Sequence, residues 1–159
     1  FPRRELFDPD TQATFKWERW ATLRGRRAHV YSYKVAKDRS KWHVNYQRIE
    51  DVVPAYHGLV YIDNDTNVIV RLTFEADLPP SFPLQQASTV LDYDYADIAG
   101  QPYLLPLKAV VRMREGRLLV RNDVEFRMYR KFSADAVLKF EAETPDPLPE
   151  DTTTEAPPR

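Results

Sequence analysis

The sequence predicts an all-β domain, or a mainly β domain with a minor helix, built on a curved antiparallel meander sheet or barrel. The composition favours this fold class, because 9 Tyr, 8 Phe and 3 Trp are residue types that suit pleated sheet. Short runs of alternating apolar and polar residues recur along the chain, and turn residues separate them at intervals of about ten residues. Helical periodicity is scarcely visible, and residues 82–90 are the best candidate for a helix outside the lead-in.

The chain divides into three parts. Residues 1–14 hold two prolines and predict a lead-in or the end of a helix, and residues 15–142 predict a single antiparallel β domain. Residues 143–159 hold five prolines and three consecutive threonines. Such a segment buries too little apolar area to offset its ordering entropy, so it predicts a disordered tail. Because the chain begins at Phe1, with no methionine and no apolar segment like the core of a signal peptide, we expect a processed or trimmed part of a longer protein.

The first half of the domain predicts five strands. Residues 15–23 and 26–35 are joined by the turn Arg24-Gly25, and a third strand is expected at 42–46. The clearest hairpin joins residues 56–62 to 68–76. Its turn, residues 63–67, consists of Asp, Asn and Thr, and Asp and Asn bond their own backbone and tolerate left-handed geometry.

The second half begins with a loop at residues 78–83, where three prolines exclude an interior strand. Alternation returns at residues 89–95. A turn at 99–102 then precedes a strand at 103–113, and a tight turn at 114–117 leads into a long last ribbon that reaches residue 132. Residues 136–141 are expected as an extension of this ribbon.

A set of ring and aliphatic side chains is expected on one face of the curved sheet. Such a face encloses either a packed core or an apolar cavity, and the pattern alone does not separate the two. If a cavity exists, its ligand-binding residues are Trp17, Tyr31, Tyr33, Trp42, Tyr61, Leu72, Phe74, Tyr93 and Leu105.

Charge is segregated along the chain although the net charge is −1. Residues 1–48 carry 12 basic and 5 acidic side chains, whereas residues 49–97 carry 1 basic and 9 acidic ones. In a meander these blocks become neighbours, so a surface that neutralises itself is expected. Basic side chains near rings suit single-stranded nucleic acid, and those concerned are Arg24, Arg26, Arg27, Lys34, Lys37, Arg39 and Lys41 near Tyr31, Tyr33 and Trp42. The adjacent acidic block argues against that partner, and we expect no nucleic acid.

The sequence predicts no cofactor and no metal site. There is no cysteine, and His29, His43 and His57 are too scattered for zinc. Residues 63–67 match only the opening of a calcium loop, because Val68 and Phe74 stand where glycine and glutamate are required. No apolar run is long enough to span a membrane.

Three acidic residues near one strand end give an alternative of a different class. Asp92, Asp94 and Asp97 match the residue type that divides acid and base roles in glycoside hydrolysis. However, Asp92 and Asp94 alternate with apolar residues, as on a solvated strand face. We therefore expect a protein that is not an enzyme, with a hydrolase as the third hypothesis.

Residues 56–113 resemble the middle of the Lol-type periplasmic lipoprotein carriers, the outer-membrane lipoprotein-sorting fold. The matching elements are Tyr61-Ile62-Asp63, Thr66, Val70-Arg71, the turn Asp97-Ile98-Ala99-Gly100 and Pro106. Residues 15–142 also look like an uncharacterised domain of exported bacterial proteins. The resemblance implies an incomplete antiparallel barrel around an apolar cavity for acyl chains, and a periplasmic or secreted location.

The leading functional hypothesis is a non-enzymatic exported domain that binds a lipid or other apolar ligand on the aromatic face. The alternative is a protein-interaction or structural module whose sheet is simply packed.

Overall fold

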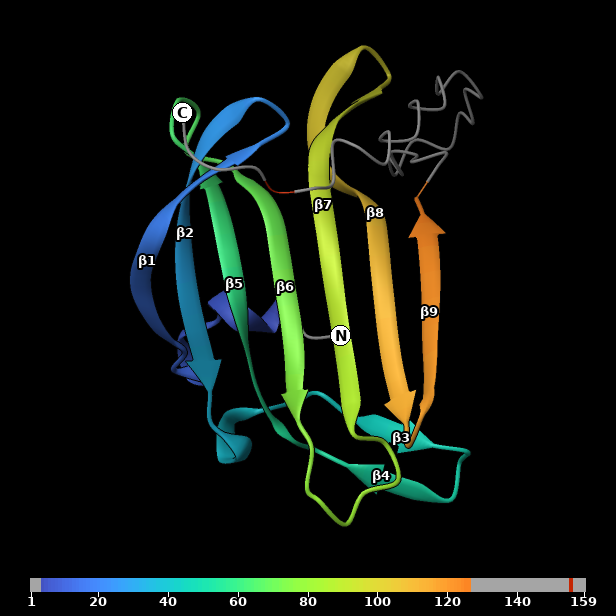
Figure 1. Cartoon of the computed structure of the whole chain (residues 1–159). Coiled ribbons are helices and arrows are strands. Elements are labelled where there is room, and N and C mark those ends of the chain that lie inside the picture. The colour runs from blue at the N-terminus through green and yellow to red at the C-terminus, as the bar shows by residue number, and fades with distance from the viewer. Residues whose placement is uncertain (1–3, 127–154, 156–159) are drawn as a thin grey trace, which may run out of the picture.

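The computed structural model describes residues 4–126 and residue 155. These residues are mainly β, as predicted, and the sheet is not closed into a barrel. Seven antiparallel strands lie side by side in the order β1-β2-β5-β6-β7-β8-β9, and a separate two-stranded sheet contains β3 and β4 (Figure 1). The strands are β1 Thr14–Leu23, β2 Arg26–Val35, β3 Val44–Tyr46, β4 Glu50–Val52, β5 Ala55–Asp63, β6 Ile69–Asp77, β7 Gln86–Ile98, β8 Gln101–Glu115 and β9 Leu118–Glu125.

Tight turns keep consecutive strands adjacent. The β1–β2 turn has φ of 51° at Arg24 and 72° at Gly25, and the β7–β8 turn has φ of 53° at Ala99 and 78° at Gly100. Two positive φ angles define the type I′ turn, whose twist matches that of the strands it joins. Both turns were predicted from the sequence. Their geometry explains how strands as long as β7 and β8 stay paired along their length.

The core lies on one face of the sheet, which we call the core face. Tyr33, Tyr56 and Phe74 are each about 1% exposed there, and their rings make edge-on or tilted contacts with centroids 6.1 to 6.2 Å apart. Leu6 covers them from η1 (Glu5–Phe7), the first of two 3-10 turns behind β5 in Figure 1. The lead-in therefore serves as the lid of the core, together with η2 (Pro9–Thr11).

Two sequence predictions are wrong. The third strand is shorter than expected and lies outside the main sheet, because residues 44–46 pair with β4 after a turn with positive φ at Gln47 and Arg48. This arrangement leaves Trp42 free to pack edge-on against the core rings. Residues 82–90 are not helical. They are a loop and the start of β7, and their apolar side chains pack in a second cluster of Val44, Ala76, Phe82, Leu84 and Ala87.

Some predictions fall outside the described residues. These are the last ribbon beyond residue 126, its extension at 136–141, and the tail at 143–159 apart from Glu155.

Candidate functional site

Seven of the nine predicted ligand-binding residues lie on the core face. Side chains directly opposite each other on paired strands share a face, and one row of partners runs across β1, β2, β5, β6, β7, β8 and β9. Its members are Trp17, Tyr31, Val60, Leu72, Leu91, Ala109 and Val124. Tyr33, Trp42, Phe74 and Tyr93 pack on the same side.

The centre of this face is a packed core. Tyr33, Leu72 and Phe74 are about 1% exposed, and Trp42 closes over the last of these rings at a centroid distance of 6.4 Å. Burial raises the pKa of Tyr33 and raises that of Tyr56 to about 12. The side chains of Tyr33, Tyr56, Leu72 and Phe74 therefore have almost no exposed surface with which to contact a ligand.

Two predicted residues lie elsewhere. Tyr61 is opposite Val30 and Arg71, and it packs in a small cluster on the other face of the sheet. Leu105 is opposite Asp94 because the register shifts between Asp92 and Tyr93, where β8 contributes one extra residue. A bulge of this kind exchanges the faces of the residues on one side of it relative to those on the other, and strict alternation along β8 therefore misplaced Leu105.

Exposed rings continue the core face onto β1 and β2. Phe7, Phe15 and Trp17 are 50%, 47% and 45% exposed. Phe7 stacks on Phe15 with an interplanar angle of 7°, and Trp17 meets Trp20 edge-on at 6.1 Å. We call this surface the ring patch and define it by Phe7, Phe15, Trp17, Trp20, His29 and Tyr31. It lies at the edge of the sheet, since β1 pairs only with β2 among the described strands.

A β-bulge brings the two tryptophans together. Trp17 and Trp20 are three residues apart, which in a regular strand would put them on opposite faces. The register shift between Trp17 and Arg19 places Trp20 opposite His29 and Trp17 opposite Tyr31, and therefore both on the core face. Sequence reasoning missed Trp20 for this reason. The sequence signal that could have indicated the bulge is the pair of charged residues, Glu18 and Arg19, between the two tryptophans.

Polar contacts fix the ring patch. Trp17 Nε1 donates to His29 Nδ1 at 3.2 Å, and this bond requires the neutral imidazole with its proton on Nε2. The Arg27 guanidinium lies 3.7 Å from the centroid of the Trp20 ring, close enough for a cation–π contact. The patch therefore presents ordered rings with a cation at one end.

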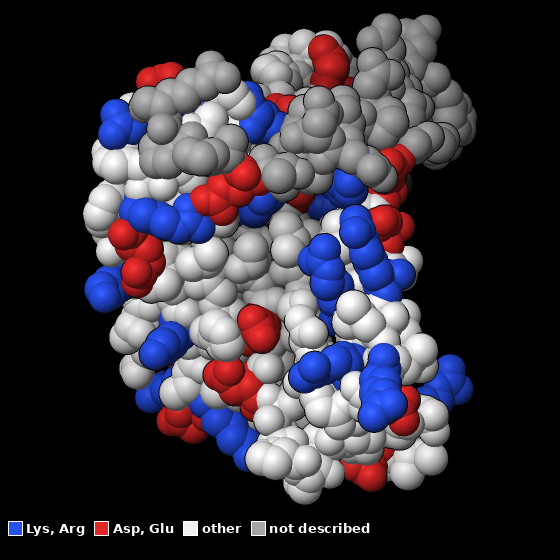
Figure 2. All heavy atoms as spheres, in the orientation of Figure 1, with Lys and Arg blue, Asp and Glu red and all other residues white. Residues whose placement is uncertain are grey.

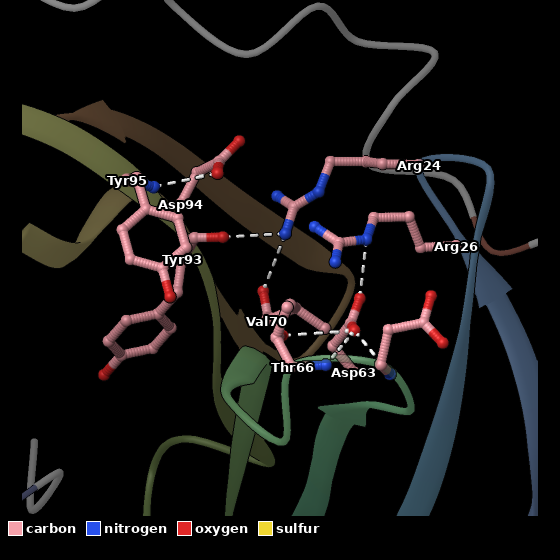
Figure 3. A network of polar contacts seen from close by, with 9 residues as sticks. Arg24, Arg26, Asp63, Thr66, Val70, Tyr93, Asp94 and Tyr95 are labelled. Atoms are coloured by element: carbon pink, nitrogen blue, oxygen red, sulfur yellow. Dashed lines mark hydrogen bonds and ion pairs between the residues drawn. The ribbon is translucent and has the colours of Figure 1, made fainter. Parts of the chain in front are cut away.

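A polar cavity lies where β6 and β7 separate. The pairing of these strands ends at Arg71 and Asp92, and Arg24 of the β1–β2 turn occupies the gap beyond that point. Its Nη2 donates to the carbonyl oxygens of Val70 at 3.2 Å and Tyr93 at 2.7 Å (Figure 3). Next to it, Arg26 Nε lies 2.7 Å from Asp63 Oδ2. Asp94 and Tyr95 line the cavity from β7, and its volume is about 150 Å³.

The Asp63 carboxylate bonds both to the hairpin turn at residues 63–67 and to Arg26 in the wall of the cavity. Its Oδ1 accepts hydrogen bonds from the backbone N–H of Asp65 and Thr66, each at 2.9 Å, and from the Thr66 hydroxyl at 3.1 Å. Burial disfavours the charged carboxylate, but these bonds and Arg26 outweigh it and lower the pKa. The first carboxylate of the calcium-like loop, Asp63, thus uses one oxygen to cap the hairpin turn and the other to pair with Arg26.

A charged row crosses the face opposite the core. The turns η1 and η2 lie behind the sheet in Figure 1, so Figure 2 views this opposite face. Arg71, Asp92 and Lys108 lie side by side there and are 7%, 1% and 6% exposed, with Arg71 Nε 2.8 Å from Asp92 Oδ1. The whole row of partners is Arg19, Val30, Tyr61, Arg71, Asp92, Lys108 and Glu125.

Basic side chains gather farther along β8 and β9 on the same face. Arg112 and Arg121 are direct partners there, and Figure 2 shows basic side chains over these strands.

Glu155 reaches the other end of this row. Its carboxylate pairs with Arg19 and accepts a hydrogen bond from the Tyr61 hydroxyl at 2.9 Å. Arg19 and Arg71 lie over the Tyr61 ring at 5.9 Å and 5.7 Å from its centroid. Burial alone would raise the pKa of Glu155, but its bonds to Arg19 and Tyr61 lower it.

The remaining candidate residues have structural partners. Asp92 is paired with Arg71, and Asp97 Oδ1 accepts from the Gly100 N–H at 2.9 Å in the β7–β8 turn. His43 contacts Asp51 at 3.1 Å, and His57 contacts Asp77 at 2.8 Å. Within residues 4–126 and 155, no group of three or more His, Cys, Asp or Glu side chains could hold a metal ion. The hydrolase stays a hypothesis.

No protein-family model, curated protein or solved structure matches this chain. In the part of the chain that the structure describes, no helix is long and apolar enough to cross a membrane.

Proposed function

We propose that the protein is a non-enzymatic binding module and that the ring patch on β1 and β2 docks a protein partner. The observation that carries this proposal is the half exposure of Phe7, Phe15 and Trp17 next to a core whose rings are almost fully buried. Large apolar side chains exposed side by side mark interaction sites. Trp, Tyr and Arg are also the residue types that supply most of the binding energy in protein interfaces.

The partner is expected to offer apolar side chains and a carboxylate. The stacked rings of Phe7 and Phe15 form an apolar surface at one end of the patch. At the other end Arg27 lies over Trp20 and keeps its N–H donors at an exposed position. A carboxylate on the partner would find a guanidinium whose position is already fixed, so little side-chain entropy is lost on binding.

A lipid is the second candidate ligand for the same surface. The rings provide apolar area for an acyl chain, as the leading sequence hypothesis requires. A small-molecule site, however, buries about 70–90% of its ligand in a concave pocket, whereas the ring patch lies on an open sheet edge. A protein partner covers such a surface more completely, and for this reason it ranks first.

The location proposed for this activity is periplasmic or secreted. It rests on the family resemblance of residues 56–113 alone. Fractionation of the producing cell tests it, and recovery of the chain in the cytoplasm would count against it.

The experiment is site-specific photo-crosslinking from position 15, with position 119 on the opposite edge strand as the control, since Leu119 is 58% exposed. An adduct formed only from position 15 identifies the partner, which is then purified and titrated against the protein. Trp17→Ser should weaken its binding about 30-fold or more, because loss of an interface anchor costs about 2 kcal/mol or more. Leu119→Ser should leave it unchanged. Equal binding by the Trp17→Ser variant, or saturable binding of phosphatidylglycerol vesicles in place of a protein, would refute the proposal.

A further inference from the structure

Arg19, Tyr61 and Glu155 form a closed set of polar contacts on the face opposite the core. The Arg19 guanidinium pairs with the Glu155 carboxylate through both terminal nitrogens, Nη1 with Oε1 and Nη2 with Oε2, the second pair at 3.1 Å. The Tyr61 hydroxyl donates to the same Oε2 at 2.9 Å. Both carboxylate oxygens are therefore bound, although 136 positions of sequence separate Arg19 from Glu155.

The bulge in β1 puts Arg19 on this face. After the register shift Arg19 is opposite Val30 on β2, and Val30 is opposite Tyr61 on β5. Val30 is fully buried, and the Arg19 guanidinium lies 5.9 Å from the centroid of the Tyr61 ring. The Arg19 side chain therefore crosses β2 and meets Tyr61 two strands away.

The sheet itself holds the Tyr61 hydroxyl in place. Tyr61 is 3% exposed, and its ring packs in a buried cluster. Arg71 lies over the same ring at 5.7 Å from its centroid and is fixed by its pair with Asp92. An exposed ion pair contributes little when two mobile side chains must be ordered. A guanidinium that binds both carboxylate oxygens, beside a hydroxyl that is already fixed, gives a stronger and more specific contact.

The charged row has one cation more than it has anions. Its cations are Arg19, Arg71 and Lys108, and its anions are Asp92 and Glu125. Asp92 pairs with Arg71, and within residues 4–126 no carboxylate lies within ion-pair distance of Arg19. Glu155 therefore supplies at the β1 end an anion that the sheet does not offer there. Its side chain is 31% exposed, a value that fits a bound side chain.

We propose that Arg19 and Tyr61 form a recognition site for a glutamate carboxylate and that Glu155 of the same chain is its ligand. Arg19 supplies the charge and two donors, and Tyr61 supplies the third donor. Residues 127–154 connect Phe126 to Glu155, and a link of that length keeps the carboxylate at about millimolar effective concentration or above.

The site ties the chain at Glu155 to β1 and β5. Residues 143–159 carry five acidic side chains and one basic one, so charge favours the approach of this segment to the cations of the row. The site lies on the face opposite the ring patch and does not depend on the function proposed for that patch.

The test is an NMR titration of the Glu155 side-chain carboxyl carbon in the full chain from pH 7 to about pH 3, with the signal assigned by its loss in Glu155→Gln. Bonds to Arg19 and Tyr61 hold the pKa of Glu155 below the ordinary value of 4.5. We expect that pKa to rise toward 4.5 in Tyr61→Phe, which removes only the hydroxyl, and to rise further in Arg19→Gln. Arg112→Gln removes a cation from β8 on the same face and is the matched control, which should leave the pKa of Glu155 nearly unchanged.

The reciprocal measurement follows the side-chain signals of Arg19 and Tyr61. Glu155→Gln should shift both signals, because the charged acceptor is lost. Glu150→Gln removes another carboxylate from residues 143–159 and should shift neither. Both variants keep every residue of the sheet.

Four outcomes would overturn the proposal. A Glu155 carboxyl that titrates at its ordinary pKa would show that no carboxylate is bound, and equal effects of Arg112→Gln and Arg19→Gln would assign the shift to the general charge of the face. Equal shifts from Glu150→Gln and Glu155→Gln would mean that the site does not select Glu155. A titration that depends on protein concentration would make a second copy the source of the carboxylate. If Arg19→Gln unfolds the protein, Tyr61→Phe still decides, because the Tyr61 hydroxyl bonds only to Arg19 and Glu155 among the described residues.

Discussion

Tyr33 reaches across Gly58 to the strand beyond it. The two residues are direct partners on β2 and β5, and the Tyr33 hydroxyl donates to the Thr73 carbonyl oxygen on β6 at 2.5 Å. A Cβ at position 58 would overlap that carbonyl and lie 2.8 Å from the Tyr33 hydroxyl oxygen. The missing side chain thus allows one ring to tie three strands together at the centre of the core.

Gly58→Ala is expected to destabilise the protein by about 1–3 kcal/mol or more, because an extra carbon in a packed interior forces backbone and side chains apart. Urea unfolding followed by circular dichroism measures the change. Gly100→Asn is the matched control, since nothing lies within 4 Å of a Cβ there and Asn tolerates positive φ. Similar losses in the two variants would refute the role given to Gly58.

The buried Arg71–Asp92 pair predicts a large asymmetry between single and double substitutions. Asp92→Ala leaves Arg71 and Lys108 buried without the carboxylate between them, and we expect a loss of about 3–5 kcal/mol. Replacing both members by apolar residues, as Arg71→Met with Asp92→Leu, should restore the part of that loss that comes from Arg71, while Lys108 stays without the carboxylate. Asp123→Ala, from the exposed pair with Arg121, should change stability by less than about 1 kcal/mol. Equal effects at positions 92 and 123 would contradict this interpretation.

Alternation in the sequence was sufficient to predict most of the sheet. Positions 26–35 of β2 and the turn at Arg24-Gly25 match the structure, and the turn predicted at 99–102 is correct at its first two residues, because side-chain period and turn chemistry are local properties. The blocks of opposite charge also become neighbours, as in the Arg26–Asp63 pair between β2 and β5.

The features that local pattern could not predict depend on register and on distant contacts. Trp20 was missed and Leu105 was misplaced because β1 and β8 each contain a bulge, and one extra residue exchanges faces without altering composition. Arg24 was recognised as a turn residue, but its bonds to Val70 and Tyr93 span 46 and 69 positions of sequence. The aromatic face is packed and not hollow because Leu6 and Trp42 pack on it, and both lie outside the main sheet.

The bonds of the Asp63 carboxylate predict that the stability of the protein falls in acid. Its pKa is lower in the folded protein than the ordinary value of 3.8, so the unfolded chain binds the proton more readily. The stability from its bonds is present above the ordinary pKa and is lost as the pH falls through the folded pKa. Asp63→Asn should therefore cost about 1–3 kcal/mol at pH 7, and the difference from the unchanged protein should shrink as the pH is lowered below about 4. Urea unfolding of both proteins between pH 7 and pH 3 measures it, and a difference that stays constant would exclude the ionised carboxylate as the cause.

Tyr33 and Tyr56 predict the behaviour of the core at high pH. Burial raises the pKa of both hydroxyls above the ordinary value of 10.0, to about 12 for Tyr56. The neutral forms are therefore favoured in the folded state. The stability that depends on them is fully present below pH 10 and is lost as the pH rises through the folded pKa values. Ultraviolet titration of tyrosinate should show a delayed step that coincides with loss of the near-ultraviolet circular dichroism signal. Tyr56→Phe should reduce the delayed step by one tyrosine, whereas Tyr95→Phe, at a position 48% exposed, should leave it unchanged. Ionisation of all tyrosines in a single early step, with the fold intact, would mean that these two hydroxyls are not buried.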